Sequence, residues 1–408
     1  MTLSEVREKL ARYGQEQLLR FYDDLNETER QALCEQIERT DFDVLKNMEM
    51  RGKKTARGVF APLAALELSD IAEKADAFRA EGLSVIRARK VAAVLLAGGM
   101  GTRLGSDDPK GMYDIGITKP VYIFQRLIEN LKEVTDEAGN TIRLFIMTSE
   151  KNHDATVRFL KEHSFFGYPE EDVTFFMQDM APACDYDGKV FLESKGTIAT
   201  SPNGNAGWYK SMQKAQLDRV LHDERIEWLN VFAVDNVLQR IADPVFLGAT
   251  ALARAECGSK VVRKANPDEA VGVMCLEDGR PSIVEYYELT AEMRDAVNEK
   301  GDPAYNFGVI LNYLFYEPAL QRIAEKQLPL HVVEKKIAHI DENGNPVKAD
   351  KPNGCKFEQL VLDMIHELDS CVAFEVVREH EFAPVKNKTG VDSVESARAL
   401  CEKAGIIL

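Results

Sequence analysis

The spacing of apolar residues divides the chain into a helical beginning and an alternating α/β middle. Over residues 1–88, apolar side chains recur every three or four positions, which predicts amphipathic helices and few strands. The expected helices are 4–11, 15–26, 27–38 and 41–50. At Lys90 the pattern changes to the continuous apolar run KVAAVLLAGG, which is typical of a buried parallel strand entering a loop.

The same alternation continues through the middle of the chain. Apolar runs at 142–148, 173–178 and 228–234 predict further buried strands, and 152–163 predicts a helix between them. This order favours an α/β fold with a doubly wound parallel sheet.

Later segments predict additions to that sheet. After residue 260 we expect a strand in SKVVRKA, a hairpin that turns at Asp278 and Gly279, and a second turn in HIDENGNPVK. CVAFEVV and SVESARALCEKAG predict a strand and a capped helix. The expected regions are N-terminal helices over 1–88, the catalytic core over 89–325 and a small C-terminal α+β lobe over 326–408.

Charge narrows the possible partners. The 408 residues carry 51 Lys and Arg against 67 Asp and Glu, a net charge of −16, which disfavours nucleic acid and anionic membranes as partners. An anionic substrate therefore needs a local basic pocket. No apolar run approaches a membrane span and the first residues are charged, so we expect a cytoplasmic protein; its oligomeric state is not predicted.

The strongest chemical signal is LAGGMGTRLG, residues 96–105. Glycines that follow a buried strand let backbone N–H groups approach a polyphosphate closely. Taken alone, the spacing also fits a dinucleotide-binding loop or a plain structural loop. Arg103 and the following Lys110 add two fixed cations, which suit a triphosphate better.

Two weaker motifs accompany it. In AVDN, Asp235 ends an apolar strand at the edge where ligands bind in open α/β sheets, so it is either a Mg²⁺ ligand or a helix cap. In SPNGNAGWY, Gly204 and Asn205 would read a sugar or base edge, or only form a turn. Gln178 at the end of VTFFMQ has the same ambiguity.

Taken together, these motifs resemble the UDP-sugar pyrophosphorylase family, and most closely its eukaryotic-type UDP-N-acetylglucosamine pyrophosphorylases. The matching segments follow in order along nearly the whole chain: GQEQLLRFYDDL, LAGGMGTRLG, PKGMYDIG, IMTSE, MQDMAPA, SPNGNAGWY, VDNVLQRIADP, VEYYEL, KPNGCKFE and FAPVKN. The resemblance implies a Rossmann-like nucleotidyltransferase that converts UTP and a sugar 1-phosphate, best N-acetylglucosamine 1-phosphate, into UDP-sugar and pyrophosphate.

The resemblance also implies a role for each matching position. The residues implied for the nucleotide are Leu96, Ala97, Gly98, Gly99, Gly101, Thr102, Gln178 and Gly204. Those implied for the sugar are Asn205, Gly272, Glu285 and Asn306. Arg103, Lys110 and Lys386 would be catalytic, and Asp235 would bind the Mg²⁺ cofactor. We expect Lys386 to reach the phosphates when the C-terminal lobe closes.

Several alternatives stay open at this point. Leu360 and Leu362 replace aromatic residues associated with an N-acetyl pocket, so glucose, galactose and N-acetylgalactosamine 1-phosphates remain candidate substrates. A silent UDP-sugar-binding protein is a second possibility, although Arg103, Lys110, Asp235 and Lys386 are all present. A nicotinamide oxidoreductase is disfavoured, because that class has no need for the loop lysine.

Overall fold

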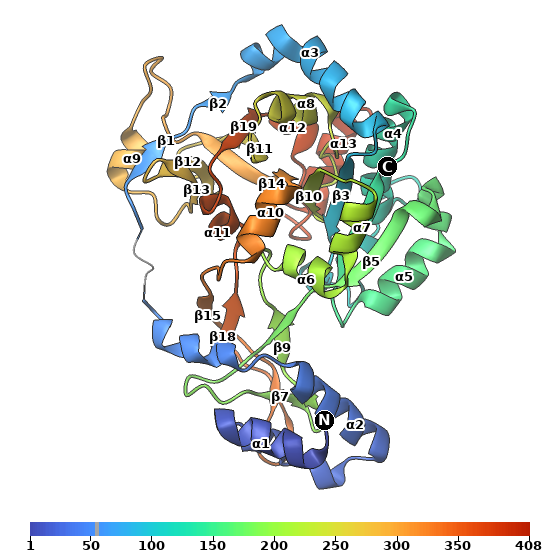
Figure 1. Ribbon diagram of the computed structural model, residues 1–408, viewed down its shortest axis with the longest axis vertical. Coiled ribbons are helices and arrows are strands. Elements are labelled where there is room, and N and C mark those ends of the chain that lie inside the picture. The colour runs from blue at the N-terminus through green and yellow to red at the C-terminus, as the bar shows by residue number, and fades with distance from the viewer. Residues whose placement is uncertain (54–56) are drawn as a thin grey trace. The chain divides into compact units, whose positions relative to one another are not determined.

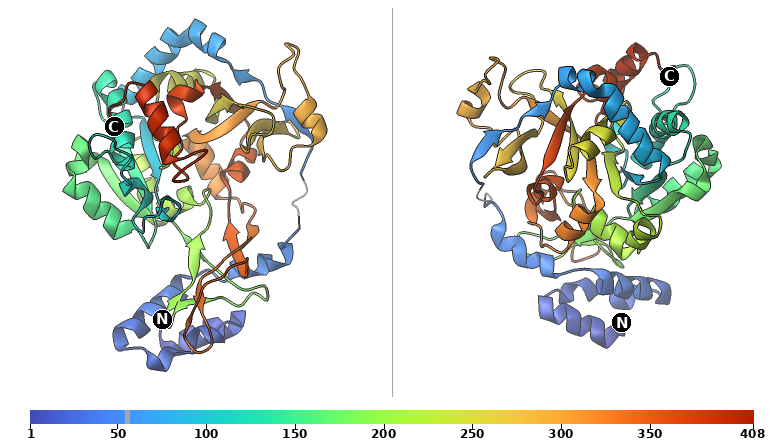
Figure 2. Two further views of the ribbon diagram at one scale, coloured as in Figure 1. Left: turned by 180° about the vertical axis from the view of Figure 1, so that it is seen from behind. Right: turned by 45° about the horizontal axis from the view of Figure 1, so that its top comes forward.

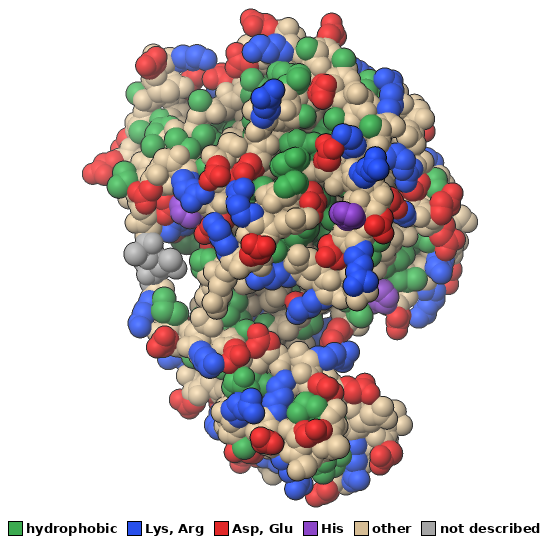
Figure 3. Space-filling model, viewed as in Figure 1, with side chains coloured by type: hydrophobic (Ala, Val, Ile, Leu, Met, Phe, Trp, Pro, Cys, Tyr) green, Lys and Arg blue, Asp and Glu red, His purple; other side chains and the backbone are tan. Residues whose placement is uncertain are grey.

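The chain forms two compact units that each combine segments distant in sequence. The computed structural model describes residues 1–53 and 57–408. Unit 1 contains residues 1–56, 179–207 and 328–361, and unit 2 contains residues 57–178, 208–327 and 362–408. Acidic and basic side chains are mixed over each unit on the face that Figure 3 shows. No helix in the described part of the chain has both the length and the apolar character of a membrane span.

Unit 1 packs two N-terminal helices against short hairpins. Helices α1 (Leu3–Tyr13) and α2 (Glu27–Arg39) begin at capping boxes formed by Thr2 and Asn26. The strands pair antiparallel as β6 (Met180–Pro182) with β9 (Thr200–Pro202), β7 (Leu192–Ser194) with β8 (Thr197–Ile198), β15 (His331–Lys335) with β18 (Gly354–Glu358), and β16 (His339–Ile340) with β17 (Pro346–Val347). The shared core includes Leu10, Leu33, Ile37, Ile198, Cys355 and Phe357.

Unit 2 is built on an 11-stranded sheet with the central order β2-β19-β11-β14-β10-β3-β4-β5 (Figure 1). The strands in this central order are β2 (Ala65–Leu66), β3 (Val91–Leu96), β4 (Arg143–Thr148), β5 (Val173–Met177), β10 (Trp228–Ala233), β11 (Cys257–Arg263), β14 (Phe307–Tyr316) and β19 (Cys371–Glu375). Outside this order, β12 (Val273–Glu277) pairs with β14, with its hairpin partner β13 (Arg280–Val284) and with β1 (Phe60–Pro62). Neighbours along the path are parallel except that β14 runs antiparallel to both β10 and β11.

Helices cover both faces of this sheet (Figures 1 and 2). One face holds α3 (Leu68–Arg87), α4 (Ile123–Ala138), α5 (His153–Glu162), α8 (Pro244–Leu252) and α13 (Val394–Lys403). On the other face Trp208 of α6 (Trp208–Lys214) stacks near Phe315 of β14. The remaining helices are α7 (Leu217–Asp223), α9 (Ala291–Asp295), α10 (Glu317–Ala324), α11 (Val361–His366) and α12 (Arg378–Glu381).

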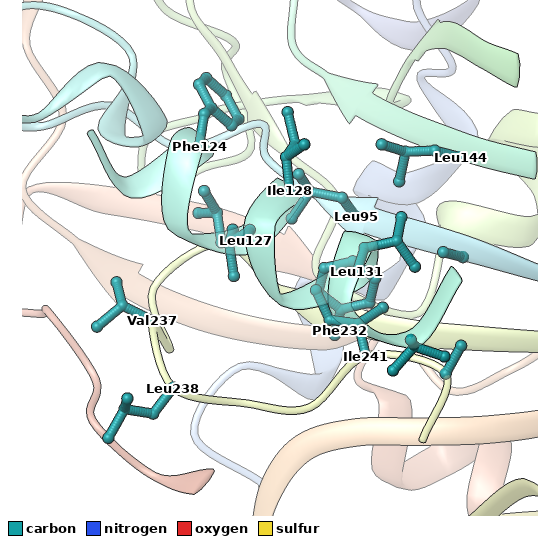
Figure 4. Packing of buried hydrophobic residues seen from close by; sticks show 14 of the residues in the cluster. Leu95, Phe124, Leu127, Ile128, Leu131, Leu144, Phe232, Val237, Leu238 and Ile241 are labelled. Carbon is teal, nitrogen blue, oxygen red and sulfur yellow. The ribbon is translucent and has the colours of Figure 1, made fainter. Parts of the chain in front are cut away.

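The core of unit 2 follows from these amphipathic patterns. Figure 4 shows side chains of α4 packed against three adjacent strands. These are Phe124, Leu127, Ile128 and Leu131 on the helix, and Leu95, Leu144 and Phe232 on β3, β4 and β10. All are almost completely buried, so the sheet is held from this side by apolar packing.

Most elements predicted from the sequence are confirmed. The expected strands appear as β3, β4, β5, β10, β11 and β19, and the expected helices as α1, α2, α5 and α13. Asp278 and Gly279 form the hairpin turn with φ of 49° and 82°, the left-handed backbone that such a turn requires.

Two helix predictions are wrong. Residues 15–26 and 41–50 form short 3₁₀ turns at Glu16–Leu19, Tyr22–Asp24 and Asp43–Met50 instead of α-helices. The side chain of Gln15 explains the first case, because it donates to the carbonyl of Gly188 (2.9 Å) and accepts from the N–H of Val190 (2.9 Å). These contacts within unit 1 fix a turn that local periodicity does not encode.

The packing also divides the chain differently from the sequence-based boundaries at 88 and 325. Residues 57–88 supply β1, β2 and α3 to unit 2, whereas residues 328–361 belong to unit 1. The C-terminal residues 362–408 join unit 2, because β19 pairs with β11 in the main sheet, so they do not form a separate lobe.

Helices α3 and α8 approach so closely that only glycine fits at the crossing. A Cβ on Gly82 would lie 1.9 Å from the carbonyl oxygen of Pro244, and one on Gly248 would lie 1.8 Å from that of Phe78. We expect Gly82→Ala to destabilise unit 2 by about 2 kcal/mol through overpacking, although alanine has the better helix propensity. Urea unfolding measures this change.

The matched control is Ser84→Ala, on the exposed surface of the same helix. It should change the free energy of unfolding by less than about 0.5 kcal/mol. Equal stability of both variants would contradict the steric explanation.

Candidate active site

The glycine loop leaves the sheet at the carboxyl end of β3. Backbone hydrogen bonds close it, from the N–H of Gly101 to the carbonyl of Asp108 (2.8 Å) and from the N–H of Lys110 to the carbonyl of Gly99 (3.1 Å). A Cβ on Gly99 would meet no atom of residues 1–53 or 57–408 within 4 Å, so among these residues the space over this part of the loop is open. The loop is therefore a fixed turn with free space where a phosphate would approach.

A buried asparagine, which the sequence analysis missed, holds the start of this loop. The Nδ2 of Asn152 donates to the carbonyls of Ala97 (2.9 Å) and Gly99 (3.3 Å). Its Oδ1 accepts from the N–H of Ser149 (2.7 Å), and the side chain is fully buried. Nothing in the sequence near IMTSEKNH marks this asparagine, because its partners lie far away along the chain.

Asp235 lies beside the loop because β10 is the parallel neighbour of β3. The chain runs from β3 outward to β4 and β5 and then returns to β10 on the other side, so the loop and Asp235 flank the topological switch point. The Asp235 carboxylate is 3.8 Å from the Lys110 ammonium, and both side chains are largely buried. Burial lowers the pKa of Lys110, Asp235 opposes this shift, and the charges of Lys386 and Arg103 lower the pKa further.

The charges of two predicted catalytic cations, Arg103 and Lys386, therefore act on the third, Lys110, in unit 2. Arg103 is exposed on a 3₁₀ turn (Thr102–Leu104) that begins at Thr102, and its guanidinium has no hydrogen bond or ion pair within the described chain. Lys386 is held by Asp392, at 2.9 Å between Nζ and Oδ2. Its neighbour Val385 donates its N–H to the carbonyl of Asp235 (2.8 Å). Lys386 is thus beside Asp235 without closure of a lobe.

Gln178 follows β5 at the same edge of the sheet. A Cβ on Gly98 would lie 2.4 Å from its Nε2, so the glycine is what allows the amide to lie against the loop. Gln178 is buried, and its Nε2 has no hydrogen-bond partner among the described residues. A buried donor left without a protein partner is unfavourable unless a ligand accepts from it.

Three of the four residues predicted for the sugar, Gly272, Glu285 and Asn306, also belong to unit 2. β14 runs antiparallel to its neighbours, so its beginning, next to Asn306, lies where β11 and β10 end. The carboxylate of Glu285 would be 3.4 Å from a Cβ on Gly272, and Gly272 accepts a hydrogen bond from Val309 (2.9 Å). Asn306 accepts from the N–H of Lys264 through Oδ1 (3.2 Å), which leaves its Nδ2 without a hydrogen bond among the described residues.

A second residue missed by the sequence analysis, Arg57, supports Glu285. The N–H of Glu285 donates to Glu288 (3.0 Å), which pairs with the Arg57 guanidinium (3.3 Å). Arg57 also pairs with Glu277 (2.8 Å). Burial and the charge of Glu288 raise the pKa of Glu285, and Arg57 opposes this shift.

Gly204 and Asn205 belong to unit 1, while every other predicted site residue belongs to unit 2. Gly204 has φ of 90°, and a Cβ there would lie 2.0 Å from the carbonyl oxygen of Gln359. Asn205 accepts a hydrogen bond from the N–H of Val361 (2.8 Å) through Oδ1. Within unit 1 these two residues therefore shape a tight turn.

Comparison with known proteins places this arrangement in a family. The model of a family described as UTP–glucose-1-phosphate uridylyltransferase matches residues 48–405. The chain belongs to the UTP–glucose-1-phosphate uridylyltransferase family. This match and the relatives below confirm the resemblance to UDP-sugar pyrophosphorylases.

Relatives in this uridylyltransferase family align with most of the chain. It is 39% identical to the UDP-N-acetylhexosamine pyrophosphorylase-like protein 1 of Mus musculus, over 95% of this chain and 81% of that protein. It is 36% identical to the UDP-N-acetylglucosamine diphosphorylase 2 of Arabidopsis thaliana, over 96% and 82% respectively. The crystal structure of the uridine diphosphate N-acetylglucosamine pyrophosphorylase from Trypanosoma brucei matches with a TM-score of 0.81 and 27% identity, over 96% and 83%.

The hydrogen bonds of Asn152 lead to a prediction about the loop. Asn152→Ala leaves the carbonyls of Ala97 and Gly99 without their donor, so we expect a stability loss of about 1–3 kcal/mol. UTP should also bind roughly tenfold more weakly, because the loop is no longer held in one conformation. Isothermal titration calorimetry and urea unfolding measure the two effects.

The control is Asn230→Ala, which removes another buried amide, one that donates to Asn312 and to Tyr313 within the sheet. It should lose similar stability but keep its affinity for UTP. If both variants lose affinity in proportion to stability, Asn152 has no specific effect on the loop.

Proposed function

We propose that this protein transfers the uridylyl group of UTP to an N-acetylhexosamine 1-phosphate, with N-acetylglucosamine 1-phosphate as the best substrate, and releases pyrophosphate. The observation that carries this proposal is the pairing of Lys110 with Asp235 beside an open glycine loop, with the charges of Arg103 and Lys386 close enough to act on Lys110. Relatives whose names specify N-acetylhexosamine or N-acetylglucosamine support the choice of sugar.

The reaction needs charge neutralisation more than a protein nucleophile. An oxygen of the sugar phosphate attacks the α-phosphorus of UTP, and the bond from that phosphorus to the bridging oxygen breaks to release pyrophosphate. A phosphate monoester is already largely dianionic at pH 7, because its second pKa is about 6, so no general base is required. In this scheme Lys110 acts at the α-phosphate, with Arg103 and Lys386 on the other phosphate oxygens.

Recognition of the two substrates follows from the remaining residues. The unpartnered Nε2 of Gln178 suits a carbonyl oxygen of uracil. Glu285 suits sugar hydroxyls as an acceptor, and the Nδ2 of Asn306 suits a sugar oxygen as a donor. The roles of Gly204 and Asn205 at the uracil and the sugar, and the cytoplasmic location, stay predictions.

We include Mg²⁺ in the proposal, with Asp235 as its protein ligand. The described residues contain no group of three His, Cys, Asp or Glu side chains that would hold a metal. One carboxylate at the phosphate site nevertheless fits Mg²⁺, which commonly binds one or two carboxylates and completes its shell with phosphate oxygens and water. When bound, the ion would neutralise phosphate charge as the negative charge on pyrophosphate develops.

Pyrophosphate release tests the proposal directly. The purified protein is incubated with UTP, Mg²⁺ and, in turn, the 1-phosphates of N-acetylglucosamine, N-acetylgalactosamine, glucose and galactose. The N-acetylated sugars should give the highest kcat/KM. Binding of UDP-sugar without any turnover would instead identify a silent binding protein.

The lowered pKa of Lys110 gives a prediction for pH dependence. A lysine binds phosphate only when it is protonated. Because the pKa of Lys110 is lowered, kcat/KM for UTP should begin to decrease at a pH below the ordinary lysine pKa of about 10.4. Lys110→Arg stays charged above that range and should move the alkaline limb upward, even at a lower maximal rate. The control Lys119→Arg changes an exposed lysine and should leave the alkaline limb unchanged. If the limb does not move in Lys110→Arg, the titrating group is not Lys110.

The metal assignment gives a second prediction. Asp235→Asn should raise the Mg²⁺ concentration for half-maximal rate by roughly tenfold or more, the effect expected when a metal ligand shell is weakened. The melting temperature should change little, because asparagine occupies the same volume as aspartate and the side chain at this position keeps some access to solvent. Asp107→Asn removes an exposed carboxylate of the same loop region and serves as the control. Early melting of Asp235→Asn with a normal Mg²⁺ titration would make Asp235 structural.

A further inference from the structure

Lys260 of β11 is completely buried and is not one of the predicted site residues. The ammonium of Lys260 donates to Glu381 (2.5 Å), to the carbonyl of Arg240 (3.1 Å) and to Asp243 (3.2 Å). Lys260 is 0% exposed, and Asp243 and Glu381 have little access to solvent. All three donors of the ammonium therefore have an acceptor.

Such a buried cluster is a poor way to gain stability. Apolar side chains of similar volume often stabilise a protein as well or better, because charged groups lose hydration on burial. A buried ion pair does fix geometry, since its partners cannot move without leaving a charge unpaired. The cluster is therefore better explained by the segments that it holds in place than by the stability that it adds.

Glu381 opens a segment that runs along the residues after β10. The carbonyl of Glu381 accepts from the Asn236 amide (2.7 Å), and the N–H of Ala383 donates to the Oδ1 of Asn236 (2.9 Å). The N–H of Val385 then donates to the carbonyl of Asp235 (2.8 Å). Segment 381–386 is thus bonded to Asn236 at Glu381 and Ala383 and to Asp235 at Val385, and the carboxylate of Glu381 ties its start to Lys260.

Lys386 depends on this alignment for its position. Its own further contacts go to Asp392, through the backbone N–H (2.7 Å) and through the ammonium (2.9 Å), and Asp392 belongs to the same loop. Ala383 and Val385 are buried in the core of unit 2, so the segment is packed against that core. The polar contacts of Glu381 and Asn236 set its register relative to Asp235.

We propose that Lys260 is a positioning residue for uridylyl transfer: by binding Glu381 and Asp243 it fixes segment 381–386 against Asp235 and so sets Lys386 beside Lys110. The inference rests on the proposed function in assigning Lys386 to the phosphates. Without Lys260, the buried Glu381 carboxylate keeps the N–H of Arg240 (3.2 Å), and the Asp243 carboxylate keeps the N–H of Val245 (3.1 Å) and the Arg240 guanidinium (3.9 Å), so neither retains a close cationic partner among the described residues. Glu381 then takes up a proton or moves toward water, and either change weakens the bonds that fix the start of the segment.

A double-mutant cycle tests whether Lys260 acts through Lys386. Lys260→Met should lower kcat about 10- to 100-fold, the effect of a misplacement of roughly 1 Å, with a smaller change in KM for UTP. Lys260→Met combined with Lys386→Ala should then lose no more than Lys386→Ala alone. Independent, multiplied losses would overturn the proposal.

Hydrogen–deuterium exchange gives a readout that does not need activity. Peptides covering 381–392 should exchange faster in Lys260→Met, as should those around Arg240 and Asp243, which also lose a bond to Lys260, while the peptides of unit 2 without such a bond keep their protection. Glu381→Gln removes one charge at constant size and should show the same local effect more weakly, which keeps the test available if Lys260→Met fails to fold. Unchanged exchange of 381–392 in the folded variants would overturn the positioning role.

Asp172→Asn is the matched control. Asp172 is buried and pairs with Arg89 at 2.7 Å, but it precedes β5 at the opposite edge of the sheet. It should lose stability without faster exchange in 381–392 and without coupling to Lys386→Ala. If the wild-type protein is inactive with every sugar phosphate, the proposed function fails, and the exchange experiment still decides whether Lys260 positions the segment.

Discussion

The charge of the largely buried Lys110, at one edge of the sheet, is the constraint on which the site in unit 2 depends. Burial disfavours this charge, and the charges of Lys386 and Arg103 disfavour it further. The carboxylate of Asp235 offsets part of this effect at 3.8 Å. A polyphosphate would offset the rest, so a site that is unfavourable when empty favours binding of an anion.

The topology explains how residues so distant in sequence meet at this edge. Parallel strands β3, β5 and β10 end there, and a predicted site residue follows each within two residues: Gly98, Gln178 and Asp235. Reversal of β14 brings its beginning to the same edge and adds Asn306. Lys386 comes from the C-terminal part of the chain, on a segment bonded to Asp235. One edge of the sheet therefore carries the groups proposed for phosphate, base and sugar.

Local patterns in the sequence were sufficient for the elements and for the residues next to strand ends. KVAAVLLAGG and WLNVFAVD predicted β3 and β10 because continuous apolar runs reflect burial on both faces. The 3₁₀ turns after α1 could not be predicted, because Gln15 is bonded to residues 188 and 190. The same holds for Asn152 and Lys260, whose roles depend on partners brought together only by the fold.

These unpredicted residues have one property in common, which bears on how the site works. Asn152 and Lys260 are buried polar side chains that direct their donors at the backbone or carboxylates of the segments carrying the glycine loop and Lys386. Apolar residues would bury the same volume but would leave those segments free to slide. Catalysis by charge neutralisation depends on donors that are in place before the charge develops. The buried polar contacts therefore fix the segments that carry Arg103, whose side chain is exposed and unpaired among the described residues, and Lys386, whose ammonium is held only by Asp392 of its own loop.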